Sequence, residues 1–189
     1  RCRDATGFTQ GRYFMTGRAA QKAESIELVV LDVDGVMTDG TLLYGGPDDP
    51  EIKAFNIKDG LGIKLLQQCN IEVAIITGRA SPAVERRAQE LGITALIQSR
   101  EDKGQALDEL LKSLQLPASA SAYMGDDLPD LGALQIAGLA TCPANAADAV
   151  IACADWVAPA PGGHGAVRAL CDFILQAQGH IPDLYDRFR

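Results

Sequence analysis

Short apolar segments alternate with longer segments of mixed polarity along most of this chain. The apolar segments have the length of buried strands and predict β-strands at 28–31, 72–76, 94–97, 122–124, 138–141 and 156–158. The segments between them predict helices at about 60–69, 82–91, 103–114, 129–136, 146–153 and 166–178. Because strands that alternate with helices form right-handed crossovers, we expect an α/β fold, a Rossmann-like parallel sheet with helices on both faces.

Two of the predicted helices begin with specific local signals. Ser81 followed by Pro82 fits an N-cap with proline at the first helical position. Asp102, with Gln105 three residues later, predicts a capping box at the start of the helix at 103–114.

One segment departs from the alternation. Two short runs, at 41–44 and 52–56, flank the sequence Gly-Gly-Pro-Asp-Asp-Pro and predict a β-hairpin over residues 41–56. No repeat or linker divides the chain, so we expect one domain over residues 1–189, with an N-terminal extension at 1–25 and a mobile tail at 179–189. No gap between predicted elements is large enough to hold a cap domain.

The composition excludes several classes of protein. Hydrophobic residues make up 47% of the chain and charged residues 22%, which is typical of a globular protein. The net charge of −8 disfavours nucleic acid as a partner, and no apolar run of about 18 residues is present to span a membrane. The five cysteines include no Cys-x-x-Cys pair, so we expect reduced thiols in a cytoplasmic protein. Eight of the 17 basic residues nevertheless lie between Lys53 and Lys103, which favours a pocket for an anion.

The first predicted strand ends in two acidic residues, Asp32 and Asp34. Residues two apart in an extended segment point the same way, so both carboxylates leave the strand on one side. Two carboxylates at such a short distance repel each other unless a cation lies between them or they share a proton. Mg²⁺ suits a site whose ligands are all oxygens. The pair alone is equally consistent with a plain acidic turn. A calcium loop is excluded because Val36 and Leu43 occupy its fifth and twelfth positions.

Further polar residues follow the later predicted strands. Thr77 and Arg79 follow the strand at 72–76, Asp126 follows the strand at 122–124, and Lys103 opens a helix after the strand at 94–97. Each of them alone reads as a turn, cap or surface residue. Together they favour a functional site, because ligands of open parallel sheets bind beyond the carboxyl ends of the strands.

These residues resemble the four motifs of the haloacid dehalogenase superfamily of phosphohydrolases. The motifs read Asp32-Val-Asp34-Gly-Val, Thr77-Gly-Arg, Lys103 and Gly125-Asp126-Asp127-x-x-Asp130. The resemblance implies that Asp32, ionised at neutral pH, attacks phosphorus to form an aspartyl-phosphate, and that Asp34 acts as general acid and then general base. It also implies Mg²⁺ held by Asp32, the backbone carbonyl of Asp34 and Asp126, with Thr77 and Lys103 holding the phosphoryl oxygens.

Longer segments, at 53–60, 73–79, 125–130 and 162–168, resemble the 3-deoxy-D-manno-octulosonate 8-phosphate (KDO 8-phosphate) phosphatases within that superfamily. This resemblance implies hydrolysis of KDO 8-phosphate during synthesis of the inner core of lipopolysaccharide. His164 stands where arginine is expected in that family. The substrate contacts that the resemblance implies are Asn56, Lys58, Asp59, Gly60, Lys64, Arg79, Arg87 and Asp127.

A site without a cap needs another cover, because an open rim cannot exclude water from a small sugar phosphate. Thr77 and Lys103 are only 26 positions apart, which leaves no room for a cap domain between them. A neighbouring subunit is the simplest cover. The resemblance implies a homotetramer in which the hairpins assemble and adjacent chains wall each site.

Three alternatives stay open at this point. A phosphatase for a related nine-carbon sugar acid, such as KDN 9-phosphate, would carry the same motifs. A phosphoreceiver signalling domain also combines Asp, Thr, Lys and Mg²⁺, but its phosphorylated aspartate follows a middle strand. A scaffold subunit that has lost catalysis is disfavoured, because every side chain needed for the chemistry is present.

Overall fold

A parallel sheet forms the centre of the protein, whose computed structural model describes residues 17–46 and 50–187. Its strand order is β3-β2-β1-β4-β5-β6, and all neighbouring pairs are parallel. The strands are β1 (Leu28–Leu31), β2 (Glu72–Ile76), β3 (Ala95–Ile97), β4 (Ser121–Met124), β5 (Leu139–Cys142) and β6 (Trp156–Val157). Since the chain winds outward from β1 in both directions, the switch in strand order falls beside β1, where sites of such folds form.

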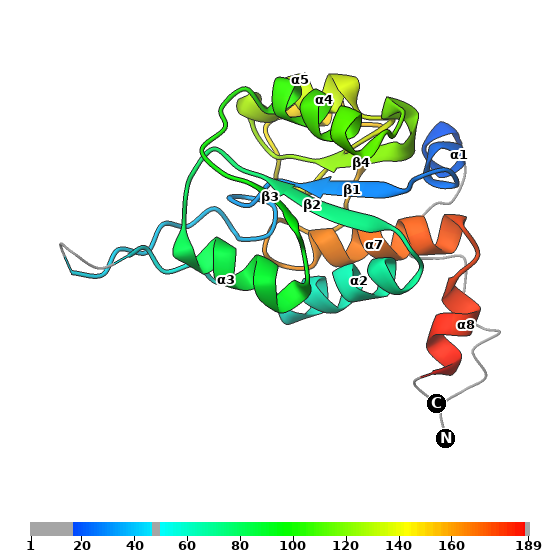
Figure 1. The fold of residues 1–189 in the computed structure, drawn as a ribbon, viewed down its shortest axis with the longest axis horizontal. Helices are drawn as coiled ribbons and strands as arrows, with labels where there is room; N and C mark the ends of the chain where they lie inside the picture. The colour runs from blue at the N-terminus through cyan, green and yellow to red at the C-terminus, as the bar shows by residue number, and fades with distance from the viewer. Residues whose placement is uncertain (1–16, 47–49, 188–189) are drawn as a thin grey trace.

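Helices cover both faces of this sheet (Figure 1). One face carries α4 (Lys103–Leu114), α5 (Leu131–Ile136) and α6 (Asp148–Ile151). The other carries α2 (Ile57–Gln68), α3 (Pro82–Leu91) and α7 (Ala166–Ala177), with α1 (Arg18–Ala23) and α8 (Ile181–Asp186) at one end. Short 3₁₀ turns, η2 (Ala118–Ala120) and η3 (Leu128–Asp130), flank β4. The predicted α/β fold is confirmed, and the described residues include no cap domain.

Alternate residues of β1 pack on opposite faces of the sheet. Val29 and Leu31 join the apolar cluster under α2 and α7, whereas Leu28 and Val30 join the cluster under α4 and α5. All four side chains are fully buried. A strand covered on both faces has no polar side, which explains the unbroken apolar run in the sequence. Asp32 therefore extends directly from the packed centre of the molecule.

Most element boundaries lie within two residues of the prediction, and α3 and α4 have the predicted bounds. The exception is α2, which begins three residues early because Asn56 caps it and accepts a hydrogen bond from the Lys58 N–H at 2.8 Å. The predicted capping box at Asp102 is wrong, since its carboxylate pairs with Arg100 at 2.7 and 3.0 Å instead.

The predicted β-hairpin at 41–56 is reduced to two extended arms joined by one antiparallel bridge. The bridge joins Leu43 and Ile52, whose N–H donates to the Leu43 carbonyl at 2.9 Å. Pro50 has no N–H to continue the ladder toward the tip, and residues 47–49 lie outside the described part of the chain. The arms project beyond the carboxyl ends of the strands (Figure 1).

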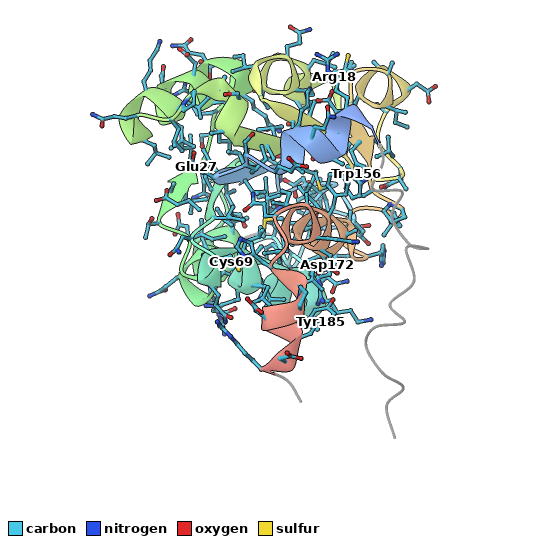
Figure 2. All side chains as sticks on the ribbon, turned by 90° about the vertical axis from the view of Figure 1, so that its right-hand side faces the viewer. Arg18, Glu27, Cys69, Trp156, Asp172 and Tyr185 are labelled. Atoms are coloured by element: carbon cyan, nitrogen blue, oxygen red, sulfur yellow. The ribbon has the colours of Figure 1, made fainter. Side chains whose placement is uncertain are left out.

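The C-terminal segment forms helix α8 rather than the mobile tail predicted for 179–189. Leu184 is 2% exposed and packs in the same cluster as α7, while Pro182 lies in the first turn, where its missing N–H is not needed. Figure 2, which looks from the end where the strands begin, shows Tyr185 on α8 below Asp172 on α7. The helix thus lies at the end of the molecule opposite the arms (Figure 1). Residues 1–16 of the predicted N-terminal extension and residues 188–189 lie outside the described residues.

Candidate active site

Three neighbouring strands end at one edge of the sheet and carry predicted catalytic residues. Asp32 directly follows β1, Thr77 follows β2, and Asp126 follows β4 after one glycine. Backbone pairing continues past the strand ends, because the Asp32 N–H donates to the Met124 carbonyl at 3.0 Å. Asp32 is 4% exposed and Thr77 is 2% exposed. The structure therefore gathers residues distant in sequence at the predicted edge.

The turn that follows Asp34 lies against the Asp126 side chain. Gly35 has a φ of +91°, and a Cβ atom at this position would lie 2.0 Å from Asp126 Oδ2. Only glycine accepts both this conformation and this contact. The Thr38 hydroxyl accepts hydrogen bonds from the N–H groups of Gly35 at 3.4 Å and Gly40 at 3.2 Å. These bonds hold the turn beside the acidic residues.

A buried lysine, Lys103, joins two acidic side chains at this edge. Its ammonium lies 2.8 Å from Asp32 Oδ1 and 2.8 Å from Asp130 Oδ1. The Tyr123 hydroxyl also donates to Asp130 Oδ1 at 2.8 Å, and the two N–H groups of the turn 126–127 donate to Oδ2 at 3.0 and 3.2 Å. Asp130 thus has four donors and fixes the position of Lys103 next to the predicted nucleophile.

Burial and charge shift the pKa values of these groups. Burial and the neighbouring Asp130 raise the pKa of Asp32 to about 7, although Lys103 opposes the shift. Burial and Asp130 also raise the pKa of Asp126 to about 6. Burial alone would lower the pKa of Lys103, but Asp32 and Asp130 outweigh it, and the net shift is upward. In the metal-free site, burial thus opposes the expected ionisation of Asp32, whereas the Lys103 ammonium 2.8 Å away favours it. The ionised nucleophile stays a prediction.

The side chains of Asp32, Asp126 and Asp130 could hold a metal ion, since one oxygen of each lies within 4.8 Å of the others. Carboxylate oxygens are the ligands that Mg²⁺ prefers. Asp130 already accepts four hydrogen bonds, so Asp32 and Asp126 are the better ligands. A divalent cation would favour the charged carboxylates that burial disfavours. The donor set therefore fits the predicted magnesium site.

The predicted general acid, Asp34, belongs to a second group of charged side chains. The Lys53 ammonium contacts Asp34 Oδ1 and lies 3.1 Å from Glu51 Oε1. The Arg79 guanidinium lies 2.6 Å from Glu51 Oε2 and 3.8 Å from Asp34 Oδ2. Two anions and two cations thus alternate, and Arg79, a predicted substrate contact, lies next to the predicted proton donor.

Two of the predicted substrate residues, Asn56 and Asp59, bind the glycine-rich loop 162–165 and the start of α7. Asn56 Nδ2 donates to the Gly163 carbonyl at 3.1 Å. Asp59 is 3% exposed and accepts a hydrogen bond from the Arg168 N–H at 2.8 Å, and burial raises the pKa of its carboxyl. In the isolated chain both side chains therefore act as supports for the loop.

Two further predicted residues, Gly60 and Arg87, pack against each other. A Cβ atom at Gly60 would lie 2.4 Å from Arg87 Nη2, so a side chain there would displace the guanidinium. Arg87 donates to the Asn56 carbonyl at 3.2 Å and lies 5.7 Å from the centre of the Phe55 ring. These contacts hold the Arg87 guanidinium beside the start of α2.

The other predicted substrate residues lie at the surface. Lys58 and Lys64 are exposed on α2, and Asp127 is exposed at the edge of the site, where it accepts a hydrogen bond from the Leu128 N–H at 2.8 Å. His164 is also exposed and lines a pocket of about 330 Å³ together with Asp39, Ala54, Phe55, Asn56, Ile57 and Gly163.

Sequence reasoning assigned no individual contact to four residues of the site: Glu51, Lys53, Tyr123 and Asp130. Tyr123 carried a usable signal, because a hydroxyl in an otherwise apolar, buried strand must find a partner. Asp130 stood in the fourth motif without an assigned contact. The contact between Lys53 and Asp34 depends on the path of the arms, which the polarity pattern does not encode.

Comparison with known sequences identifies close relatives. The haloacid dehalogenase-like hydrolase family matches residues 94–170. The 3-deoxy-D-manno-octulosonate 8-phosphate phosphatase KdsC of Escherichia coli K12 is 46% identical over 162 residues, which cover 86% of each chain. The Yersinia pestis protein of that name is 48% identical over 161 residues, covering 85% of this chain and 86% of that protein. Matches of this extent to phosphatases exclude the phosphoreceiver alternative.

Solved structures share the fold. The crystal structure of 3-deoxy-D-manno-octulosonate 8-phosphate phosphatase from Moraxella catarrhalis, in complex with magnesium ion, phosphate ion and KDO, has a TM-score of 0.88 and 44% identity, covering 90% of this chain and 98% of that chain. The cobalt-bound phosphatase from Haemophilus influenzae has a TM-score of 0.81 and 43% identity, covering 84% and 92%. By sequence and by fold, the chain belongs to the haloacid dehalogenase-like hydrolases, within the family of the KDO 8-phosphate phosphatases.

Proposed function

We propose that this enzyme hydrolyses KDO 8-phosphate to KDO and inorganic phosphate with Mg²⁺, through an aspartyl-phosphate on Asp32, in lipopolysaccharide synthesis. The observation that carries the proposal is the buried pair of Asp32 and Lys103, which lie 2.8 Å apart at the carboxyl edge of the sheet. A carboxylate held beside a cation suits attack on a phosphate ester. The relatives and the Moraxella catarrhalis complex support the choice of sugar phosphate.

The reaction would proceed in two displacements at phosphorus. In the first, an Asp32 oxygen forms a bond to phosphorus while the bond to the sugar oxygen breaks, and Asp34 gives its proton to that oxygen. In the second, water attacks the aspartyl-phosphate, Asp34 takes a proton from the water, and Asp32 is released with inorganic phosphate. Thr77 and Lys103 would hold the phosphoryl oxygens throughout.

A magnesium ion would be held by the carboxylates of Asp32 and Asp126 and by the backbone carbonyl of Asp34. When bound, it would neutralise charge on the phosphate and so reduce its repulsion of the Asp32 carboxylate. The raised pKa values of Asp32 and Asp126 support this assignment, because they follow from burial of carboxyl groups whose negative charge a cation would compensate.

Substrate recognition would involve more than one subunit. We propose a homotetramer in which the arms assemble and neighbouring chains complete each site. The supporting observation is a set of exposed apolar side chains on the arms and on α2: Leu42, Leu43, Tyr44, Ile52, Ile57 and Leu61. Such side chains would gain by burial in an interface.

The sugar carboxylate and hydroxyls would meet a mixed set of side chains. Arg79 and Asp127 would belong to the subunit that carries the nucleophile, while Lys58, Lys64 and Arg87 would face the substrate from the neighbour. Asn56, Asp59 and Gly60 would shape that wall through the contacts described above. The carboxylate of the substrate accounts for cations beyond those needed at the phosphate.

The described helices include none long and apolar enough to cross a membrane. The four cysteines of the described region form no disulfide. We propose that the enzyme acts in the cytoplasm, where thiols stay reduced.

Phosphate release from a panel of sugar phosphates, with and without Mg²⁺, tests the proposed function. KDO 8-phosphate should have the highest kcat/KM, and chelation of the metal should abolish turnover. A clear preference for KDN 9-phosphate would move the assignment to the related nine-carbon acid. Equal turnover after chelation would exclude the metal-dependent mechanism.

A further inference from the structure

Lys53 lies on the second arm and is the least exposed charged side chain of the group around Asp34. Its side chain is 2% exposed, compared with 24% for Asp34, 10% for Glu51 and 48% for Arg79. The bridge between Ile52 and Leu43 fixes the arm at the preceding residue. A lysine buried to this degree requires anionic partners, and here they are Asp34 and Glu51.

The contact with Lys53 makes the two oxygens of Asp34 unequal. An ammonium group has only donors, so the oxygen that it contacts, Oδ1, must act as an acceptor. The other oxygen, Oδ2, lies 3.8 Å from Arg79 Nε, beyond hydrogen-bond distance. Among the described residues, Oδ2 therefore remains available to the substrate.

We propose that Lys53 is a positioning residue that fixes the rotamer of Asp34 by holding Oδ1, and so leaves Oδ2 to face the leaving oxygen of the substrate. The inference rests on the proposed function, in which Asp34 is the proton donor. Glu51 supports this arrangement because it forms ion pairs with Lys53 at 3.1 Å and with Arg79 at 2.6 Å. Glu51 thereby holds both Lys53, which orients Asp34, and Arg79, which is predicted to contact the sugar.

In the step concerned, the Asp32–phosphorus bond forms and the bond from phosphorus to the sugar oxygen breaks. The bonding electrons of the broken bond stay on that oxygen, which takes a proton from the Asp34 carboxyl. Asp34 is left as a carboxylate, with Oδ1 still in contact with Lys53. A strongly basic alkoxide needs this proton, whereas a weakly basic leaving group such as p-nitrophenolate departs without it.

The leaving group therefore provides the test, with Lys53→Met as the variant. The measured quantity is kcat/KM, which covers only the steps up to departure of the leaving group. We expect kcat/KM for KDO 8-phosphate to fall about 10²-fold, in the range of general acid catalysis, and that for p-nitrophenyl phosphate to fall less than about threefold. Lys112→Met is the matched control, because Lys112 is an exposed lysine on α4 paired with Asp108, and it should leave both values unchanged.

Equal losses on both substrates would overturn the inference, since they would indicate that Lys53 binds phosphate or supports the fold. Unchanged values for both would overturn it as well. Glu51→Gln serves if Lys53→Met does not fold, and should give the same split between substrates with a smaller loss. If the wild type prefers another sugar phosphate, the proposed function fails, but the split can still be measured with that substrate.

Discussion

The two halves of the site differ in how complete they are within one chain. The catalytic half, formed by Asp32, Lys103, Tyr123 and Asp130, is buried and linked by hydrogen bonds and ion pairs of 2.8 Å. The recognition half is spread over the arms, α2 and the loop 162–165, and several of its members are exposed. Under the proposed function, the phosphoryl-transfer chemistry would depend on the fold of a single chain, whereas substrate selection would depend on surfaces that one chain leaves uncovered.

This division predicts that the sugar could be exchanged without altering the residues that act on the phosphoryl group. Residues that act on the phosphoryl group extend from the ends of β1, β2 and β4, where packing on both faces fixes their positions. Residues that would meet the sugar lie on segments with fewer buried contacts, such as the arms around Tyr44, which is 74% exposed. Substitutions in the two regions should therefore have separable effects.

The largest effect should come from Asp32→Asn in the catalytic half. The amide cannot form the aspartyl-phosphate, so turnover of both the sugar phosphate and p-nitrophenyl phosphate should fall at least about 10⁴-fold. Release of inorganic phosphate and circular dichroism of the purified variant would measure activity and fold together. More than trace activity in a folded, pure variant would rule out Asp32 as the nucleophile.

Lys103→Met should have the next largest effect and lower kcat/KM for both substrates by about 10²- to 10³-fold, because the ammonium would stabilise charge on the phosphoryl group. A loss confined to the sugar phosphate would place Lys103 in the recognition half instead.

Tyr123→Phe removes only the 2.8 Å bond to Asp130 and leaves Lys103 in place, so kcat/KM should fall by about tenfold or less. Steady-state kinetics with both substrates would measure the losses of both variants.

A smaller effect, limited to recognition, is expected for Tyr44→Glu on the arm. A charge at this exposed position should oppose assembly and lower kcat/KM for the sugar phosphate by about 10-fold, while p-nitrophenyl phosphate is hydrolysed as before. Tyr44→Phe is the matched control and should preserve both. Sedimentation and kinetics at the same protein concentration would relate assembly to activity. Dissociation without any loss on the sugar phosphate would contradict the idea of a shared wall.

The sequence predicted the catalytic half better than the recognition half, for a physical reason. Asp32, Thr77 and Asp126 follow buried strands, and the polarity pattern locates such strands closely. The partner of Asp34 could not be predicted, because Lys53 is 19 positions away along irregular arms that carry no periodic pattern. Helix α8 was missed because its six residues are held by burial of Leu184 on a surface that exists only in the folded protein.

A local pattern also gave one wrong detail, at a position where two local interactions compete. Asp102 has the spacing of a capping residue, yet Arg100 binds both of its carboxylate oxygens. A charge-assisted pair of this kind is stronger than a hydrogen bond from a backbone N–H, so the carboxylate does not cap the helix. Asn56 and Asp59 stay predicted substrate contacts, and within one chain they also hold the starts of α2 and α7. A motif therefore located these residues without revealing their partners.

The smallest expected effect is a pH-dependent stabilisation by Mg²⁺. The folded pKa values of Asp32, about 7, and Asp126, about 6, lie above the ordinary value of 3.8, so the metal-free folded state keeps protons that the unfolded state has lost. On account of these two groups, the stability of the metal-free protein should fall as pH rises from about 4 to about 7. Mg²⁺ must displace these protons, so it should bind weakly near pH 5 and more strongly near pH 8.

Saturating Mg²⁺ should therefore raise Tm by about 5–11 °C near pH 8, if it is present at about 100 times its Kd, and by less than about 1 °C near pH 5. Differential scanning calorimetry with and without the metal measures both shifts, and Asp126→Asn should remove the larger one. Equal shifts at the two pH values would mean that the metal binds elsewhere, because a site made of these carboxylates cannot take up a cation without giving up its protons. The catalytic half would then no longer be the metal site, and the raised pKa values of Asp32 and Asp126 would reflect burial alone.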